Sequence, residues 1–283
     1  MLNASINTPL VSYKSLKIGK KNNLLIISGP NVLEKNNQIN IKIAKEMKEI
    51  CKKNNFQYVF KASYYKPNRT DKGGYLGPEI EEGYRKLIEI KKKAKVFITT
   101  DVHSAEEAKI FGEICDIIQI PAAMSKHLDI IYSAGKSGKI VNIKKGQWLA
   151  PWEMKNVIER NKEKKLNKII ITERGTFHGY RNLVTDFKSF PIIKSLGVPV
   201  IADFAHSLAF AEGNSQFVNG NTGYFPFFLR SAISCGVDGI FFETHPNPKK
   251  ALANGQATIS LKDAKTLLNS VKDLAKLSKR FRS

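Results

Sequence analysis

The chain has 283 residues, of which 42% are hydrophobic and 25% are charged. This composition is typical of a globular protein and excludes wholesale disorder. No apolar run approaches the ~18 residues that a membrane-spanning helix needs, which excludes an integral membrane protein. The first twenty residues contain no continuous apolar core, so we expect no secretory signal. Cys51, Cys115 and Cys235 are too widely spaced for a disulfide framework or a zinc site, which favours a reducing cytoplasm.

The charge is strongly positive and widely spread. Lysine and arginine total 46 against 25 aspartates and glutamates, which gives a formal net charge of +21. The densest clusters, at 91–95 and 279–282, are not interleaved with aromatic residues that would stack on bases. Lysines recur throughout the chain, as on a generally basic surface. We therefore expect a small anionic substrate rather than nucleic acid.

Eight short runs of apolar, mostly β-branched residues recur along the chain, each followed by an amphipathic segment. Continuous apolar runs are typical of parallel strands that are buried on both faces. Eight such units predict a closed (β/α)8 TIM barrel over about 24–276, within a single domain, 1–283. An open doubly wound sheet is the alternative, but no G-x-G-x-x-G motif follows the first run. The runs are 24–28, 58–62, 96–100, 116–120, 140–144, 168–172, 198–203 and 239–243.

The amphipathic segments predict the helices that would cover the barrel. Their apolar residues recur at helical spacing, so one face of each segment can pack on the strands. Before the first unit, residues 10–20 predict a short β-hairpin around Gly19. The predicted helices are 39–53, 80–93, 105–113, 125–134, 153–162, 190–196, 225–235 and 261–276.

Polar or ionisable side chains stand where each apolar run stops. In a (β/α)8 barrel the carboxyl ends of all strands meet at one face, where the chemistry takes place. Cations gathered there repel one another unless an anion neutralises them. Phosphate suits such a cleft, because arginine offers a bidentate fork and lysine a point charge. The cations are Lys61, Lys66, Arg69, Lys144 and Arg174.

Two phosphates account for this number of cations better than one. Asp101, His206 and Glu243 stand at the same strand ends and are candidates for handling protons. We expect Lys145 to be solvated or to support a neighbouring residue rather than to bind substrate. The sequence thus indicates an enzyme that acts on phosphorylated substrates.

A series of short motifs follows the predicted strands in order. They are Gly-Pro-Asn-Val-Leu-Glu at 29–34, Phe-Lys-Ala-Ser at 60–63, Lys-Pro-Asn-Arg-Thr at 66–70, Thr-Asp-Val-His at 100–103, Ile-Gln-Ile-Pro-Ala at 118–122, Asn-Ile-Lys-Lys-Gly-Gln at 142–147, Glu-Arg-Gly at 173–175, Gly-Tyr at 179–180, Asp-Phe-Ala-His at 203–206 and Glu-Thr-His-Pro at 243–246. In these motifs the chain resembles the 3-deoxy-D-manno-octulosonate 8-phosphate (KDO8P) synthases. The resemblance runs from about 24 to about 274.

The resemblance implies a (β/α)8 barrel with an N-terminal hairpin, usually assembled as a homotetramer. It implies a transferase that condenses phosphoenolpyruvate with D-arabinose 5-phosphate and water and releases phosphate, in lipopolysaccharide sugar synthesis. The alternative enzyme is a 3-deoxy-arabino-heptulosonate 7-phosphate synthase, which uses erythrose 4-phosphate and has a related sequence around Pro67. Asn68 and the stretch 179–183 favour the first enzyme. The alternative from another class is a basic, non-catalytic barrel that binds nucleic acid.

The resemblance also implies roles for single residues. His206, Glu243 and Asp101 would provide electrostatic stabilisation and proton transfer. Lys126 stands where the family has an arginine that reaches the sugar phosphate of a neighbouring subunit. The phosphoenolpyruvate carboxylate and phosphate would be held by Lys61, Ser63, Lys66, Gln119, Lys144 and Arg174, and the arabinose 5-phosphate by Asn68, Arg69 and Thr70.

Four positions predict an enzyme without a metal. Metal-dependent members of the family have a cysteine, a histidine, a glutamate and an aspartate there. This chain has Asn31, His206, Glu243 and Asn254. Two neutral amides, one imidazole and one carboxylate make a poor site for a divalent transition metal. We therefore expect no metal and no other cofactor, and we count Asn31 and Asn254 among the catalytic candidates.

Overall fold

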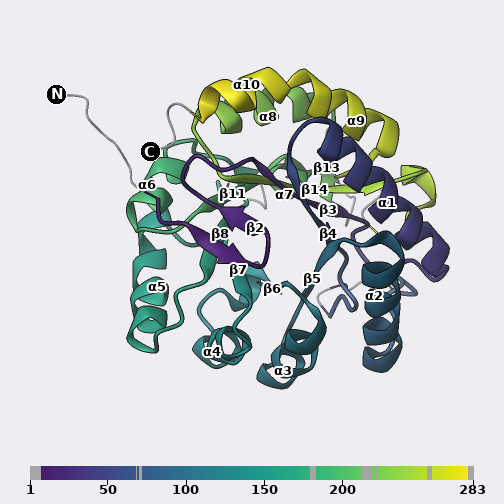
Figure 1. Ribbon diagram of the computed structural model, residues 1–283, viewed down its shortest axis with the longest axis horizontal. Helices are drawn as coiled ribbons and strands as arrows, with labels where there is room; N and C mark the ends of the chain where they lie inside the picture. The colour runs from purple at the N-terminus through teal and green to yellow at the C-terminus, as the bar shows by residue number, and fades with distance from the viewer. Residues whose placement is uncertain are drawn as a thin grey trace.

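Eight parallel strands form a closed barrel at the centre of the molecule (Figure 1). The computed structural model describes residues 8–67, 69, 72–178, 183–211, 218–220, 222–253 and 257–279. Each barrel strand pairs in parallel with its neighbour, and the pairing of β11 with β14 closes the ring. The predicted (β/α)8 barrel is confirmed. The strands are β3 (Leu25–Gly29), β4 (Gln57–Lys61), β5 (Phe97–Asp101), β6 (Ile117–Ile120), β7 (Ile140–Lys144), β8 (Ile169–Glu173), β11 (Val200–Asp203) and β14 (Gly239–His245).

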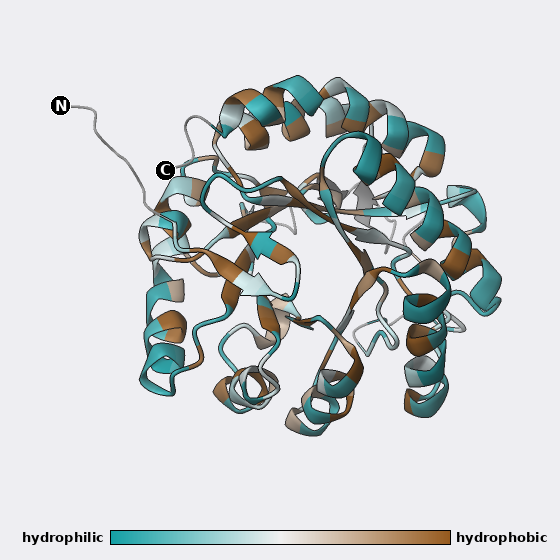
Figure 2. Cartoon of the chain, viewed as in Figure 1, coloured by the Kyte–Doolittle hydropathy of each residue, from teal (hydrophilic) through white to brown (hydrophobic). Residues whose placement is uncertain are grey.

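Helices surround the barrel and turn their apolar faces towards the strands (Figure 2). Side-chain caps begin several of them; Ser104 accepts from the Glu107 amide and Ser260 from the Asp263 amide. The last predicted helix, 261–276, is instead two helices, because the φ of −111° and ψ of 4° at Val271 interrupt the helical path. The helices are α1 (Asn37–Lys53), α2 (Ile80–Ala94), α3 (Ala105–Ile114), α4 (Leu128–Lys136), α5 (Met154–Glu163), α6 (Ser189–Ser195), α7 (Phe204–Ser207), α8 (Phe225–Ser234), α9 (Leu261–Ser270) and α10 (Lys272–Ser278).

The interior of the barrel is apolar in its amino-terminal half. Alternate residues of each strand point inward. In this half they are mainly β-branched, which fills the barrel with well-packed side chains and leaves the polar chemistry to the other end. The buried members of this cluster are Leu25, Ile27, Val59, Ile117, Ile140, Ile170, Ile201 and Phe241 from the strands, with Val11, Leu16 and Ile18 from the N-terminal hairpin.

The N-terminal hairpin covers the amino end of the barrel (Figure 1). Its antiparallel strands are β1 (Val11–Tyr13) and β2 (Leu16–Ile18), so the predicted hairpin forms. Its turn lies at Lys14 and Ser15, however, and the expected turn at Gly19 is wrong. Gly19 instead follows the second strand with a φ of +96°, and a Cβ there would lie 2.5 Å from the Pro9 carbonyl oxygen.

Smaller β-elements extend the loops around the barrel. β15 (Thr258–Ser260) pairs in parallel with β14, outside the ring. Two antiparallel pairs, β9 (Thr176–Phe177) with β10 (Leu183–Val184) and β12 (Ala209–Ala211) with β13 (Val218–Gly220), follow the strand ends of β8 and β11. Across the described ranges, none of the helices combines the length and the hydropathy needed to cross a membrane.

Candidate active site

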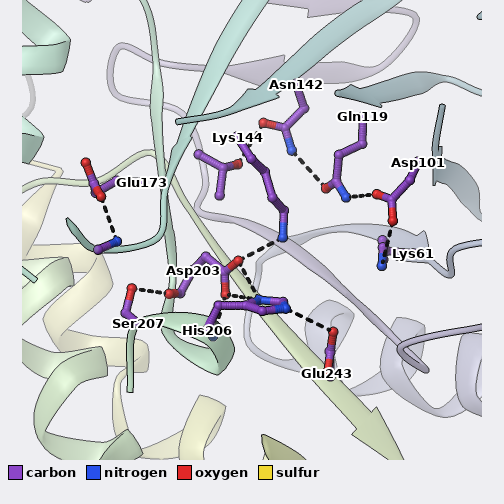
Figure 3. Close-up of polar contacts among 12 residues, drawn as sticks. Lys61, Asp101, Gln119, Asn142, Lys144, Glu173, Asp203, His206, Ser207 and Glu243 are labelled. Atoms are coloured by element: carbon purple, nitrogen blue, oxygen red, sulfur yellow. Dashed lines mark hydrogen bonds and ion pairs between the residues drawn. The ribbon is translucent and has the colours of Figure 1, made fainter. Parts of the chain in front are cut away.

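A layer of polar side chains points into the carboxyl-terminal half of the barrel (Figure 3). It follows directly on the apolar layer: β7, for example, turns Ile140, Asn142 and Lys144 inward in succession. All members are buried, so charges within the layer interact more strongly than on the surface. The members are Lys61, Asp101, Gln119, Asn142, Lys144, Thr172, Asp203 and Glu243.

Asp101 holds two lysines side by side. The ammonium groups of Lys61 and Lys66 each lie 3.6 Å from Asp101 Oδ2. The Ser63 hydroxyl donates to the same oxygen, and Lys61 Nζ donates to Ser63 Oγ at 2.8 Å. Burial would raise the pKa of Asp101, but Lys61, Lys66 and Lys144 hold it well below its usual range. Asp101 is therefore an ionised anchor for cations.

A chain of side-chain hydrogen bonds reaches Asp101 from the opposite side. The Thr172 hydroxyl donates to Asn142 Oδ1 at 2.7 Å. Asn142 Nδ2 donates to Gln119 Oε1 at 3.3 Å, and Gln119 Nε2 donates to Asp101 Oδ1. Gln119 thus presents its N–H group to a carboxylate.

Asp203 joins a lysine to a histidine. Lys144 Nζ donates to Asp203 Oδ2 at 2.8 Å, and His206 Nδ1 lies 2.8 Å from the same oxygen. Asp203 also caps α7 by accepting the backbone N–H of His206 at 3.1 Å, which fixes the histidine at the strand end. Despite burial, His206 and Lys144 hold the pKa of Asp203 well below its usual range. Burial lowers the pKa of His206, although Asp203 opposes that shift.

Glu243, near the end of β14, lies close to two other predicted catalytic residues, Asn31 and His206. Asn31 Nδ2 donates to Glu243 Oε1 at 2.5 Å. His206 Nε2 lies 3.8 Å from that oxygen, on the side of the ring opposite Asp203 (Figure 3). Because the ionised Asp203 carboxylate accepts a hydrogen bond from Nδ1–H, the neutral imidazole keeps its lone pair on Nε2. His206 Nε2 can therefore accept a proton beside the Glu243 carboxylate.

Arg174 brings a fourth cation to the site. Its Nε is buried, and the part of the chain that the structure describes offers it no hydrogen-bond partner. Burial lowers the pKa of Arg174, opposed by the attraction of Asp203 and Glu243. Neighbouring Lys145 is fully buried and donates to the Leu149 carbonyl at 2.9 Å, so it supports the loop after β7 rather than being solvated. A buried guanidinium N–H without an acceptor marks a place for an anion.

The structure corrects the electrostatic argument made from the sequence. The cations do not simply face one another, because Asp101 lies between Lys61 and Lys66, and Asp203 pairs with Lys144. Arg174 is therefore the cation whose hydrogen bonding is incomplete, because its buried Nε has no acceptor among the described residues. Burial and the neighbouring Lys61 lower the pKa of Lys66 to about 8.

Two predicted binding residues lie outside this cluster. Arg69 Nη1 donates to the carbonyl oxygens of Tyr75 at 3.1 Å and Leu252 at 2.8 Å. Lys126 is exposed and lies 3.3 Å from Glu153, beside a surface hollow of about 240 Å³. In the ranges that the structure describes, Arg69 thus contacts backbone carbonyls and Lys126 contacts a surface glutamate. The predicted residues Asn68, Thr70 and Asn254 lie outside the described residues.

Sequence reasoning did not assign a role to Asp203, Asn142 or Thr172. Each of the three side chains points into the barrel and lies two residues along its strand from another inward-pointing side chain. Asn142, for example, lies two residues before Lys144. Counting alternate positions back from each strand end would have found them. Which neighbours they contact depends on the register between strands, which the sequence pattern does not show.

Comparison with known proteins identifies the family. A model described as the DAHP synthetase I family matches residues 5–280. A relative from Citrifermentans bemidjiense, named 2-dehydro-3-deoxyphosphooctonate aldolase, is 40% identical over 262 residues, 93% of this chain and 96% of its own. Proteins of the same name from Protochlamydia amoebophila and Fusobacterium nucleatum are 39% and 38% identical, over 94% and 95% of this chain and 97% and 96% of their own. The chain belongs to the DAHP synthetase I family.

Proposed function

We propose that this protein is a 2-dehydro-3-deoxyphosphooctonate aldolase, that is, a KDO8P synthase. It condenses phosphoenolpyruvate with D-arabinose 5-phosphate and water to 3-deoxy-D-manno-octulosonate 8-phosphate and phosphate, in lipopolysaccharide sugar synthesis. The names of relatives that match more than nine-tenths of the chain support this activity. The activity of the related heptulosonate phosphate synthases, with erythrose 4-phosphate, is the alternative.

Within the site, the proposal rests on the buried Arg174 Nε–H, which has no acceptor among the described residues. Phosphoenolpyruvate has a carboxylate and a phosphate, and this N–H group can donate to such an anion. Lys66, held 3.6 Å from Asp101, adds a second cation. Lys61, Ser63 and Gln119 lie around Asp101, at the adjoining wall of the same site. The residues proposed to bind phosphoenolpyruvate are Lys61, Ser63, Lys66, Gln119, Lys144 and Arg174.

His206 is the proposed carrier of the proton. In the reaction the enol carbon bonds to the aldehyde carbon, water adds to the carbon that bears the phosphate, and the bond from that carbon to the phosphate oxygen breaks. Water loses both of its protons as its oxygen becomes the ketone oxygen: one goes to the new alkoxide and the other to the departing phosphate. His206 can carry the proton that goes to the alkoxide, because Asp203 holds Nδ1–H and leaves Nε2 free to accept it.

Two carboxylates have different proposed roles beside that proton. Glu243 lies 3.8 Å from His206 Nε2 and faces the positive charge that develops at the enol ether carbon. Asp101, which stays ionised among lysines, orients those lysines rather than accepting a proton. The site thus separates charge stabilisation from proton transfer.

We also propose that the reaction needs no metal. Asn31 points an N–H donor at Glu243, whereas a metal ligand must present a lone pair. Activity that is lost in excess chelator and restored by Mn²⁺ or Zn²⁺ would contradict this proposal.

The sugar phosphate is proposed to bind at Arg69, with Asn68 and Thr70, and to be reached by Lys126 from a neighbouring subunit of a homotetramer in the cytoplasm. Trp148 and Trp152, 53% and 61% accessible, lie on the loop and short helix that lead into α5, on the same segment as Glu153, the partner of Lys126. Light scattering on the purified protein tests the oligomeric state.

Phosphate release from phosphoenolpyruvate by chelator-treated protein tests the function. Arabinose 5-phosphate and erythrose 4-phosphate are offered separately. Release with the five-carbon sugar alone supports the octulosonate activity and the metal-free reaction together. Release with the four-carbon sugar alone moves the assignment to the heptulosonate enzymes. No release with either sugar, with or without added Mn²⁺, would overturn the proposal.

A further inference from the structure

Thr172 and Asn142 are fully buried polar residues that the proposed chemistry does not use. We propose that they are positioning residues: they hold the orientation of the Gln119 amide and thereby maintain the affinity of the site for phosphoenolpyruvate. This inference rests on the proposed function. Its basis is the direction of the hydrogen bonds that connect the three side chains.

The two ends of the chain together leave one orientation for each amide: the Asp101 carboxylate can only accept, and the Thr172 hydroxyl supplies the donor that Asn142 Oδ1 needs. The Thr172 hydroxyl donates to Asn142 Oδ1 at 2.7 Å, so the NH2 of Asn142 faces Gln119. That NH2 group donates to Gln119 Oε1 at 3.3 Å, so the NH2 of Gln119 faces Asp101. Inverting either amide would bring two oxygens, or an oxygen and a carboxylate, face to face. Such a buried contact is destabilising, because no hydrogen bond offsets the desolvation of the polar atoms.

The two residues that continue the chain beyond Gln119, Asn142 and Thr172, are not among the proposed substrate contacts. Thr172 is on β8 and Asn142 on β7, and the register that places Lys144 opposite Thr172 also brings their inward side chains together. All three residues are at most 1% exposed, so bulk water does not replace a lost donor. The orientation of Gln119 therefore depends on Thr172, three strands away from Asp101 around the barrel, as well as on Asp101 itself.

An inverted Gln119 would disturb the site through Asp101. Its carbonyl oxygen would face the ionised carboxylate, which also lies 3.6 Å from both Lys61 and Lys66. Asp101 would lose a donor and face a carbonyl oxygen, so it would no longer hold the two lysines in fixed positions. Binding of phosphoenolpyruvate would suffer first, since His206 and Glu243 take no part in the chain.

Substitution of Thr172 by valine tests the inference, because valine keeps the shape and removes the donor. Thr172→Ser restores a hydroxyl. Thr244→Val is the matched control: Thr244 is also fully buried on a barrel strand, and its hydroxyl donates one hydrogen bond, to the Ile259 carbonyl at 3.0 Å, outside the barrel. Calorimetric titration with phosphoenolpyruvate alone measures binding without turnover, and steady-state kinetics separates KM from kcat.

In Thr172→Val we expect phosphoenolpyruvate to bind roughly tenfold more weakly, with a matching rise in KM and a kcat changed less than about twofold. Thr172→Ser should recover binding, and Thr244→Val should match the wild type even if both valine variants melt at a lower temperature. Equal binding by Thr172→Val and Thr244→Val would overturn the inference alone. A wild-type chain that fails to bind phosphoenolpyruvate would overturn the proposed function, and the inference with it.

Discussion

Substitution of Asp203 by asparagine should disable the histidine while leaving its helix cap in place. Asparagine keeps one acceptor oxygen, which can still receive the backbone N–H of His206 that Asp203 now receives at 3.1 Å. The other position becomes an NH2 group that faces both Lys144 Nζ and His206 Nδ1, which each now lie 2.8 Å from Asp203 Oδ2. Against Nδ1, the NH2 group favours the tautomer that carries its proton on Nε2. That tautomer cannot accept a proton at the reacting centre.

The size of the effect follows from the contacts that are lost. A hydrogen bond to a charged group contributes about 1.5–3 kcal/mol, so we expect kcat to fall by roughly a hundredfold. Leaving the buried Lys144 ammonium without its carboxylate should destabilise the protein by about 3 kcal/mol. Removal of the negative charge also lowers the already lowered pKa of His206 further. The acid limb of the kcat/KM profile should therefore move to lower pH.

The assay compares Asp203→Asn with Asp238→Asn. Asp238 is an equally buried carboxylate at the amino end of the barrel; it accepts the Val200 N–H at 3.0 Å and lies 3.5 Å from Lys194. Both variants should lose stability in thermal or urea unfolding, but only Asp203→Asn should lose turnover per folded molecule. A folded Asp203→Asn variant with wild-type kcat, or an equal loss in Asp238→Asn, would refute the role given to Asp203.

Three further predictions concern the cations and the strand that approaches them. Because the pKa of Lys66 is lowered to about 8, kcat/KM for phosphoenolpyruvate should fall above that pH, and Lys66→Arg should move this alkaline limb upward; a limb that stays in place would rule out Lys66 as its source. Arg174→Ala should reduce kcat/KM by about 10- to 100-fold in steady-state kinetics, whereas unchanged kinetics would remove Arg174 from the binding site. Gly29→Ala should lower the free energy of unfolding in urea by about 1–3 kcal/mol, because its Cβ would lie 2.2 Å from the Lys61 carbonyl oxygen. Wild-type stability would show that β3 and β4 can move apart enough to accept the methyl group.

The sequence by itself determined the strands, the helices and the face of the barrel that carries the chemistry. Apolar runs and helical spacing are local properties, so β7 was predicted at its observed bounds and α1 within two residues. Turn positions were less certain, because several turn conformations suit a short hairpin. The chain turns at Lys14, which adopts a φ of 53°, rather than at Gly19.

Only the tertiary structure decided how the charges of the site are partnered. Lys61 and Asp101 come from neighbouring strands, while Lys144 meets Asp203 across an intervening strand, and these contacts depend on register and on closure of the ring. The sequence predicted mutually repelling cations, whereas the barrel places carboxylates between them. Arg174 keeps a buried N–H without an acceptor among the described residues because the strands around it are fixed by the whole ring. Spacing along a chain determines which side chains face inward; strand register determines which of them touch.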